Sequence, residues 1–230
     1  MEFRQAAQQL GDFIKGRLLF VEDYARRKGQ DPPQILAEVR REALDLAGED
    51  EEKRTLLEEK VFSGVILSSG HLPDWVDKVL LKAMTIVLKG PGAPLYTTTS
   101  RHPCITFEAG RFNAHRQADT VFKAFFSGKT PDSWLKNTFL SIYRQCYGDK
   151  AADQFEVREP GPGHVQVVVD NSGLEKTDRM DCSTGVGYLY GALEKLGAKS
   201  PLVTHERCGA APDRKGQPCI FEVTWDAAGE

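Results

Sequence analysis

The sequence predicts an α+β protein in which helices come first and antiparallel strands come last. In the first half of the chain, apolar residues recur at steps of three and four, as they do in amphipathic helices. From Gln154 onward the apolar period changes to two, which is typical of half-buried strands. The last fifth of the chain then follows the order helix, strand, loop, strand, and it carries three cysteines and a histidine.

The composition and charge of the chain argue against some classes of function. With 230 residues and 40% hydrophobic residues, the chain can bury a substantial core. The 33 acidic and 30 basic residues give a net charge of -3, which argues against a nucleic-acid backbone or a polybasic membrane contact. There is no export signal and no apolar run of about 18 residues, so we expect no membrane insertion and a cytoplasmic location.

The N-terminal region, residues 1–128, is expected to be mostly helical. A first helix ends in a basic stretch before Gly29, and a second runs from about Ile35 to Leu46. The charged run that follows predicts a solvated helix face. Pro73 and Asp74 open a further helix, which ends near Gly90.

Residues 89–116 are polar and lack clear periodicity. We expect a surface connection with a short strand at residues 105–107. A second interpretation is a loop that binds an anion or, through His102 and Cys104, a metal. No Gly-rich phosphate loop is present, so nucleotide chemistry has no support.

Residues 129–230 are predicted to form an α+β region that is integrated with the preceding helices in one domain. Thr130, Pro131 and Asp132 open a helix with one apolar face. Two strands follow around a Pro-Gly-Pro-Gly turn, with a closing turn at residues 171–173. In the next helix, Gly187 and Gly191 let another backbone approach closely.

The final unit contains a possible four-ligand metal site. Cys182 begins the helix, His205 and Cys208 end the next strand, and Cys219 begins the last strand. Three thiolates and one imidazole suit a closed, structural zinc site, which would tie the last helix to the last hairpin. The alternative is three reduced, buried cysteines and a surface histidine. The sequence shows no arrangement of residues that is typical of a catalytic site, so we expect a protein that is not an enzyme.

These motifs resemble the 4-vinyl reductase (V4R) domain. The resemblance covers residues 130–225 and rests on a cysteine that opens a helix with G-x-x-x-G, then E-x-C, then C-x-F-E-V-x-W. The upstream helices also resemble an uncharacterised family from myxobacteria. The resemblance implies a fold shared with haem-based nitric oxide sensors and with adaptor subunits of a Golgi tethering complex. In that fold, helices pack on an antiparallel sheet around an apolar ligand cavity, and members commonly form homodimers.

The resemblance also implies a ligand set. In sensor domains of aromatic-responsive activators, zinc is held at the positions that correspond to Cys182, His205, Cys208 and Cys219. His205 stands where those sensors have a carboxylate, so Glu206 is either a substitute ligand or an acceptor for the imidazole. Residues expected to line the cavity, unless they are plain core, are Trp134, Phe139, Tyr143, Tyr188 and Trp225.

The sequence therefore predicts a non-catalytic sensor that binds a small hydrophobic or aromatic ligand and signals through a protein partner or a homodimer. The alternative is an adaptor that docks another protein through an apolar patch. An enzyme acting on tetrapyrrole vinyl groups ranks lower because no hydride-cofactor motif is present. A haem sensor using His102 or His115 also ranks lower because no Tyr-x-Ser-x-Arg clamp is present.

Overall fold

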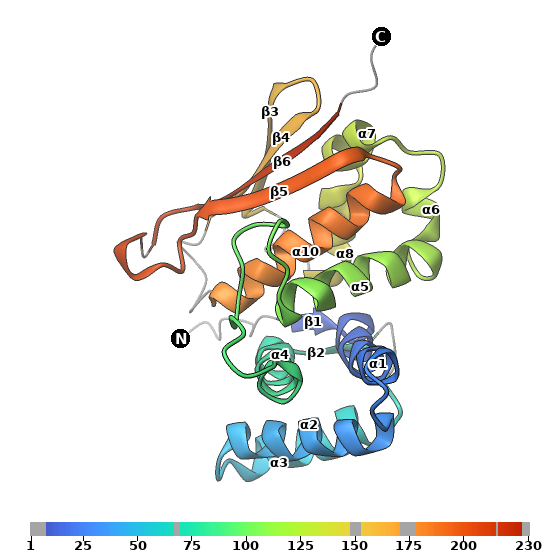
Figure 1. Cartoon of the computed structure of the whole chain (residues 1–230), viewed down its shortest axis with the longest axis vertical. Coiled ribbons are helices and arrows are strands. Elements are labelled where there is room, and N and C mark those ends of the chain that lie inside the picture. Colours follow the sequence, from blue (N-terminus) through green and yellow to red (C-terminus); the bar gives the residue numbers. More distant parts are fainter. Residues whose placement is uncertain (1–7, 67–69, 148–152, 171–177, 215, 227–230) are drawn as a thin grey trace, which may run out of the picture. The chain divides into compact units, whose positions relative to one another are not determined.

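The computed structural model describes residues 8–66, 70–147, 153–170, 178–214 and 216–226. Contacts divide the chain into two compact units, Met1–Gly92 and Ala93–Glu230. The α+β class is confirmed, because helices dominate the N-terminal part and a four-stranded antiparallel sheet lies in the C-terminal part (Figure 1). The boundary expected between residues 128 and 129 stays a prediction. None of the described helices is both long and apolar enough to cross a membrane.

The first unit is helical, with one short two-stranded sheet. Its elements are β1 (Gln8–Leu10), α1 (Gly11–Arg27), α2 (Pro32–Ala47), α3 (Glu51–Leu56), the π-helix η1 (Leu57–Phe62), β2 (His71–Pro73) and α4 (Asp74–Leu88). The helices expected before Gly29, from Ile35 and from Asp74 are confirmed. A buried bidentate ion pair between Arg17 and Asp77, at 2.9 Å for both contacts, ties α1 to α4.

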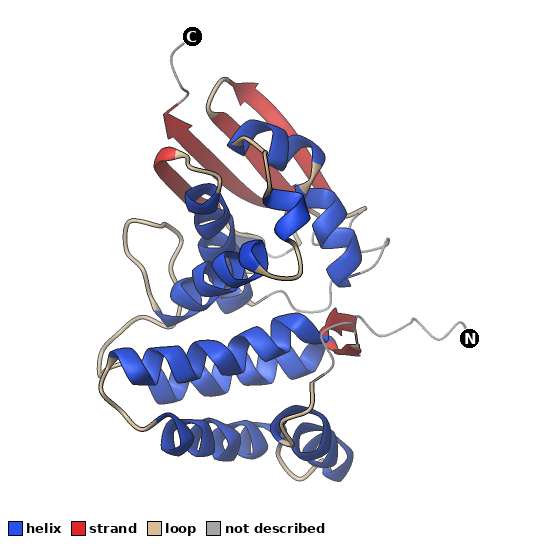
Figure 2. Cartoon of the chain, turned by 90° about the vertical axis from the view of Figure 1, so that its right-hand side faces the viewer, coloured by secondary structure: helices blue, strands red, loops and turns tan. Residues whose placement is uncertain are grey.

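The second unit contains the sheet and the helices that pack with it. Its elements are α5 (Ile105–Asp119), α6 (Lys123–Phe126), α7 (Pro131–Asn137), α8 (Phe139–Tyr147), β3 (Phe155–Gly161), β4 (His164–Val169), α10 (Arg179–Lys195), β5 (Lys199–Arg207), the 3-10 turn η2 (Pro212–Arg214) and β6 (Cys219–Asp226). The strand order is β3-β4-β6-β5, and every pair is antiparallel. Figure 2 shows these strands as one layer with the helices of the unit to one side.

Two predictions about this unit were wrong in detail. Residues 105–119 form a helix instead of a surface connection with a short strand. The helix that opens with Thr130 is interrupted at Thr138, so the predicted apolar face is divided between α7 and α8. The hairpin of β3 and β4 is confirmed, and the turn expected at residues 171–173 lies outside the described residues.

Glycines bring α5 and α10 into direct backbone contact. A Cβ added at Gly187 would lie 2.0 Å from the carbonyl oxygen of Phe107, and one added at Gly110 would lie 2.1 Å from that of Thr184. A Cβ at Gly191 would lie 2.8 Å from the carbonyl oxygen of Arg111. The close approach expected at Gly187 and Gly191 is therefore confirmed, and its partner is α5.

Candidate metal centre

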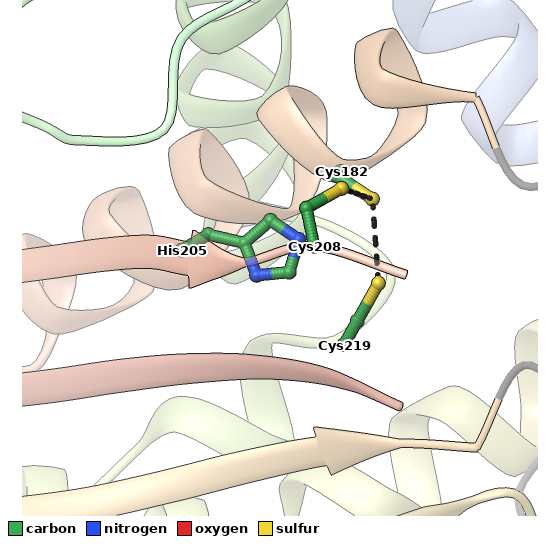
Figure 3. Close-up of side chains that lie close together, drawn as sticks. All are labelled: Cys182, His205, Cys208 and Cys219. Carbon is green, nitrogen blue, oxygen red and sulfur yellow. Dashed lines mark hydrogen bonds between the residues drawn. The ribbon is translucent and has the colours of Figure 1, made fainter. Parts of the chain in front are cut away.

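Four residues that the sequence selected as ligands lie together in the second unit. Cys182 lies in the first turn of α10, where Asp178 caps the helix by accepting the backbone N–H of Met180. His205 lies on β5, Cys208 directly follows that strand, and Cys219 begins β6. One helix start, one strand end and one strand start therefore converge on one point (Figure 3).

The four side chains are buried and close together. Their ligand atoms all lie within 4.8 Å of one another. Sγ of Cys182 lies 3.8 Å from Sγ of Cys208 and 3.8 Å from Sγ of Cys219. None of the four residues is more than 6% exposed. Glu206, the other candidate ligand, is exposed and is not part of this group.

The imidazole of His205 is oriented for a ligand role. Its Nδ1 lies 3.0 Å from the carbonyl oxygen of Ile220, and because a carbonyl can only accept, Nδ1 carries the proton. The lone pair of the neutral ring is then on Nε2, which is buried without a hydrogen-bond partner among the described residues. The ring also stacks on Phe221, with centroids 4.0 Å apart and an interplanar angle of 10°.

The thiols perturb one another. The hydrogen bond with Cys182 and the nearby imidazole of His205 lower the pKa of the Cys208 thiol. Hydrogen bonds with Cys208 and Cys219, followed by burial, raise the pKa of the Cys182 thiol. The backbone N–H of Gly209 donates to Sγ of Cys219 at 3.2 Å. Thiolates this close repel one another, so a cation between them is what would let all three ionise.

The chain segment before α5 contacts α10 at Ser183, next to Cys182, and β5 at His205. Ser183 accepts the backbone N–H of Thr97 at 3.0 Å, and it also accepts the hydroxyl of Thr106, in the first turn of α5, at 2.7 Å. The backbone N–H of His205 donates to the carbonyl oxygen of Thr98 at 2.7 Å. This segment, residues 95–104, therefore links the α10 side of the cluster to its β5 side.

The five residues expected to line a cavity do not all lie together, although Trp134, Phe139 and Tyr143 are neighbours in one aromatic cluster. Trp134 is fully buried between Phe126 and Phe139, with ring centroids 5.0 and 5.7 Å away. The ring of Tyr143 packs against that of Phe155 in a tilted arrangement, with centroids 3.9 Å apart. Tyr188 is buried, and its hydroxyl donates to Gln117 Oε1 at 3.0 Å. Trp225 alone among the five borders a groove, of about 440 Å³, at the opposite end of β6 from Cys219.

Two groups of polar residues were missed by sequence reasoning. Glu194 on α10 accepts two hydrogen bonds from Arg111, at 2.7 and 2.9 Å, and lies 2.9 Å from Nε2 of His115. Arg101, beside His102, lines the groove of Trp225. The signal in the sequence was the concentration of basic residues in the segment 89–116. Because the sequence did not predict the helix α5, it did not indicate which acidic residues these basic residues contact.

Comparisons with known proteins gave likeness in structure only. No family model matches the chain, and no curated protein matches it. A ferrous, unliganded H-NOX protein from K. algicida shares 16% identity, with a TM-score of 0.57 over 96% of this chain and 98% of that one. An oxygen-binding H-NOX domain related to soluble guanylate cyclases shares 13% identity, with a TM-score of 0.50 over 94% and 92%. A structure whose description concerns haem redox potential and porphyrin distortion shares 13% identity, with a TM-score of 0.52 over 96% of this chain and 95% of that one.

These comparisons contradict two expectations. The V4R family is wrong, because the structural neighbours are H-NOX proteins. The structural zinc cofactor, which the resemblance also implied, is wrong on the same comparison, because the description of one of these neighbours concerns haem. Short cysteine and glycine motifs alone do not define a family. What the likeness does show is that this chain has the fold of H-NOX domains.

Proposed function

We propose that the chain is a non-catalytic sensor module for a small molecule, and that Cys182, His205, Cys208 and Cys219 hold a metal ion that ties α10 to β5 and β6. The neighbours are described as an oxygen-binding domain and as H-NOX proteins, and from them we carry over only the class of small-molecule sensor. The metal ion is proposed from the side chains of this chain, and its identity is left to measurement.

The observation that carries the proposal is the geometry of the buried cluster. A tetrahedral thiolate site with metal–sulfur bonds of about 2.3 Å has ligand–ligand edges of about 3.8 Å. Both sulfur–sulfur separations from Cys182 are 3.8 Å. The fourth corner is available to Nε2 of His205, whose ring is already fixed by Ile220 and Phe221. Such orienting contacts are typical of metal-bound histidines.

Haem, which one neighbour's description names, does not fit the histidines of this chain. All five histidines are described, and an axial ligand needs an imidazole nitrogen facing an open cavity. His71 and His102 are exposed, and His115 and His164 direct Nε2 at Glu194 and Glu222. The one buried imidazole, that of His205, faces thiols. We therefore derive no sensing step through haem.

The adaptor alternative has no comparable support. Large hydrophobic side chains that are exposed in the described part of the chain are Val65, Ile86, Leu95 and Val121. Each comes from a different segment, and a docking patch would need several of them side by side. Signal output through a protein partner or a homodimer stays part of the proposal.

The test is metal content and cobalt binding. Wild-type protein purified without chelator should contain about one transition-metal ion per chain by elemental analysis. Stripped protein titrated with Co²⁺ should develop sulfur-to-cobalt charge-transfer absorption that saturates at one equivalent. Cys208→Ser should lose the metal and most of this absorption. Because coordination free energy is folding free energy in such sites, Cys208→Ser should also melt at a lower temperature.

Cys146→Ser is the matched control, because Cys146 is also buried but lies on α8, outside the cluster. It should lose stability through its buried hydroxyl and still bind one Co²⁺. A wild-type chain that binds no metal after purification under reducing conditions and shows no cobalt–thiolate absorption would refute the proposal.

A further inference from the structure

A groove of about 440 Å³ lies at the end of β5 and β6 that is remote from the cysteines. Its walls come from the segment before α5, from the start of β5, from the end of β6 and from Tyr190 on α10. All of these belong to the second unit. The size is within the range of small-molecule sites, about 300–1,000 Å³. The groove is open to solvent and combines aromatic rings with hydroxyls and charges.

One wall of the groove is fixed by hydrogen bonds to β5. Ser100 donates its backbone N–H to the carbonyl oxygen of Val203 at 2.9 Å, and its hydroxyl accepts the backbone N–H of Val203 at 3.1 Å. Thr99 pairs with Thr204 as an isolated antiparallel bridge. Arg101 follows directly, so its guanidinium is carried by backbone that is anchored to the sheet. A site whose wall is already in place does not have to order a loop when it binds.

Two half-buried aromatic rings contribute to the groove. Tyr190 is held by Phe107, with centroids 5.6 Å apart, and by Arg111, whose guanidinium lies 5.9 Å from the ring centroid. Trp225 is fixed through its backbone, which donates to the carbonyl oxygen of Gly163 at 3.0 Å. Rings that are held in position and partly exposed provide apolar surface at little entropic cost to a planar ligand.

The polar groups of the groove favour an anion. Arg101 is exposed, and its guanidinium has no ion pair or hydrogen bond to any described side chain. Ser200 has a φ of 48°, the left-handed backbone that residues other than glycine rarely adopt, at a register shift between Lys199 and Leu202. Such strain recurs at ligand sites. Asp226 is the one carboxylate in the lining, and in the ladder it lies opposite Lys199. The lining therefore carries one cation and one anion, and Lys199, the ladder neighbour of Asp226, is placed to pair with that carboxylate and leave Arg101 for a ligand.

We propose that this groove binds a small aromatic carboxylate, with its ring against Trp225 and Tyr190 and its carboxylate on Arg101 and the hydroxyl of Ser200. A guanidinium binds a carboxylate through two parallel hydrogen bonds, and these charge-assisted bonds are the strong ones. The inference rests on the proposed sensor function and names the ligand class of that sensor. None of the residues that line the groove belongs to the metal cluster.

The test uses the full chain and benzoate as the probe. Titration followed by ¹⁵N NMR should give saturable shifts of the Trp225 indole and of the Ser200 and Thr224 amides. Benzyl alcohol, which lacks the charge, and acetate, which lacks the ring, should each bind at least about tenfold more weakly. Arg101→Gln should weaken benzoate binding by at least about tenfold, while Arg41→Gln, a change at an exposed arginine on α2 in the other unit, should not.

Equal affinity of benzoate for Arg101→Gln and wild type would overturn the inference, as would the absence of saturable shifts at the groove. Tighter binding of benzylamine than of benzoate would also overturn it, because Asp226 would then dominate the groove. The two measurements separate the two proposals. A protein that contains the metal but does not bind benzoate contradicts only the proposed ligand of the groove. A protein that binds benzoate but contains no metal contradicts only the proposed metal ion in the cluster.

Discussion

At the residue scale, the side chains of Cys182, His205, Cys208 and Cys219 meet because each lies on the buried side of its segment. Cysteines have few other uses in a buried cluster, and their positions at the ends of elements follow from the periodic patterns. Alternation along β5 decides between the two remaining candidate ligands, His205 and Glu206. His205 lies on the buried face of that strand with Val203, whereas Glu206 points to the exposed side. The contacts of His205 with Ile220 and Phe221 cross between strands, so no local pattern could reveal them.

Glu222, on the other face of the sheet, gives a prediction for pH dependence. Burial alone would raise the pKa of Glu222, but hydrogen bonds from His164, Arg207 and Gln166 outweigh it, so the pKa lies below its ordinary value of 4.5. A lowered carboxyl pKa stabilises the fold above the unfolded-state value, and this stabilisation is lost as the pH falls through the folded-state value.

The difference in unfolding free energy between wild type and Glu222→Gln should therefore shrink as the pH falls below about 4.5. Urea denaturation at a series of pH values measures it. The difference should be small, because the group is largely solvated. Glu59→Gln, at an exposed carboxylate in the other unit, serves as the control. A difference that does not change with pH would contradict this account of the Glu222 contacts.

At the element scale, the helix α5 shows where sequence patterns fail. Its buried face includes Thr106, Asn113 and Gln117 together with small residues, so it has no apolar period to detect. These residues are buried because α5 packs on the glycine-bearing face of α10, and that contact depends on tertiary structure. The helices with broad apolar faces, such as α4, were predicted from their periodicity alone.

Gly187→Ala tests the contact between α5 and α10. The new methyl group would meet the backbone of Phe107 at 2.0 Å, and backbone cannot rotate away as a side chain can. We expect a loss of about 3 kcal/mol or more in unfolding free energy, measured by urea denaturation. Gly90→Ala, where nothing lies within 4 Å of the added Cβ, should change stability by no more than about 0.5 kcal/mol. Similar stabilities for the two variants would show that the helices are further apart than described.

At the scale of the whole molecule, fold class was predictable and family was not. The order of helices and strands follows from hydrophobic periods, which many unrelated sequences share. The glycine positions that suggested a family are required by local geometry, such as the close approach at Gly187, and that geometry is not confined to one family. The groove at Arg101 depends on a bridge between Thr99 and Thr204, which are 105 positions apart, so no local reading could find it.

The metal ion and the groove should be coupled, because β5 and β6 carry both. Leu202 and Thr224 border the groove, whereas His205 and Cys219 belong to the cluster. Removing the metal should weaken benzoate binding by about fivefold or more, and benzoate should make the metal harder to remove by the same factor, since coupling is reciprocal. NMR titration of loaded and stripped protein measures the first effect, and competition with a chelator measures the second. Identical dissociation constants would show two independent sites.

The meeting of α5 and α10 through bare backbone has a mechanical consequence. Most helix pairs are separated by side chains, whose rotamer changes absorb small displacements before they travel far. At Gly110 and Gly187 the two helices meet backbone to backbone, so a displacement of α10 reaches α5 without a flexible side chain in between. The same helices are joined again further along, where Glu194 on α10 contacts Arg111 and His115 on α5.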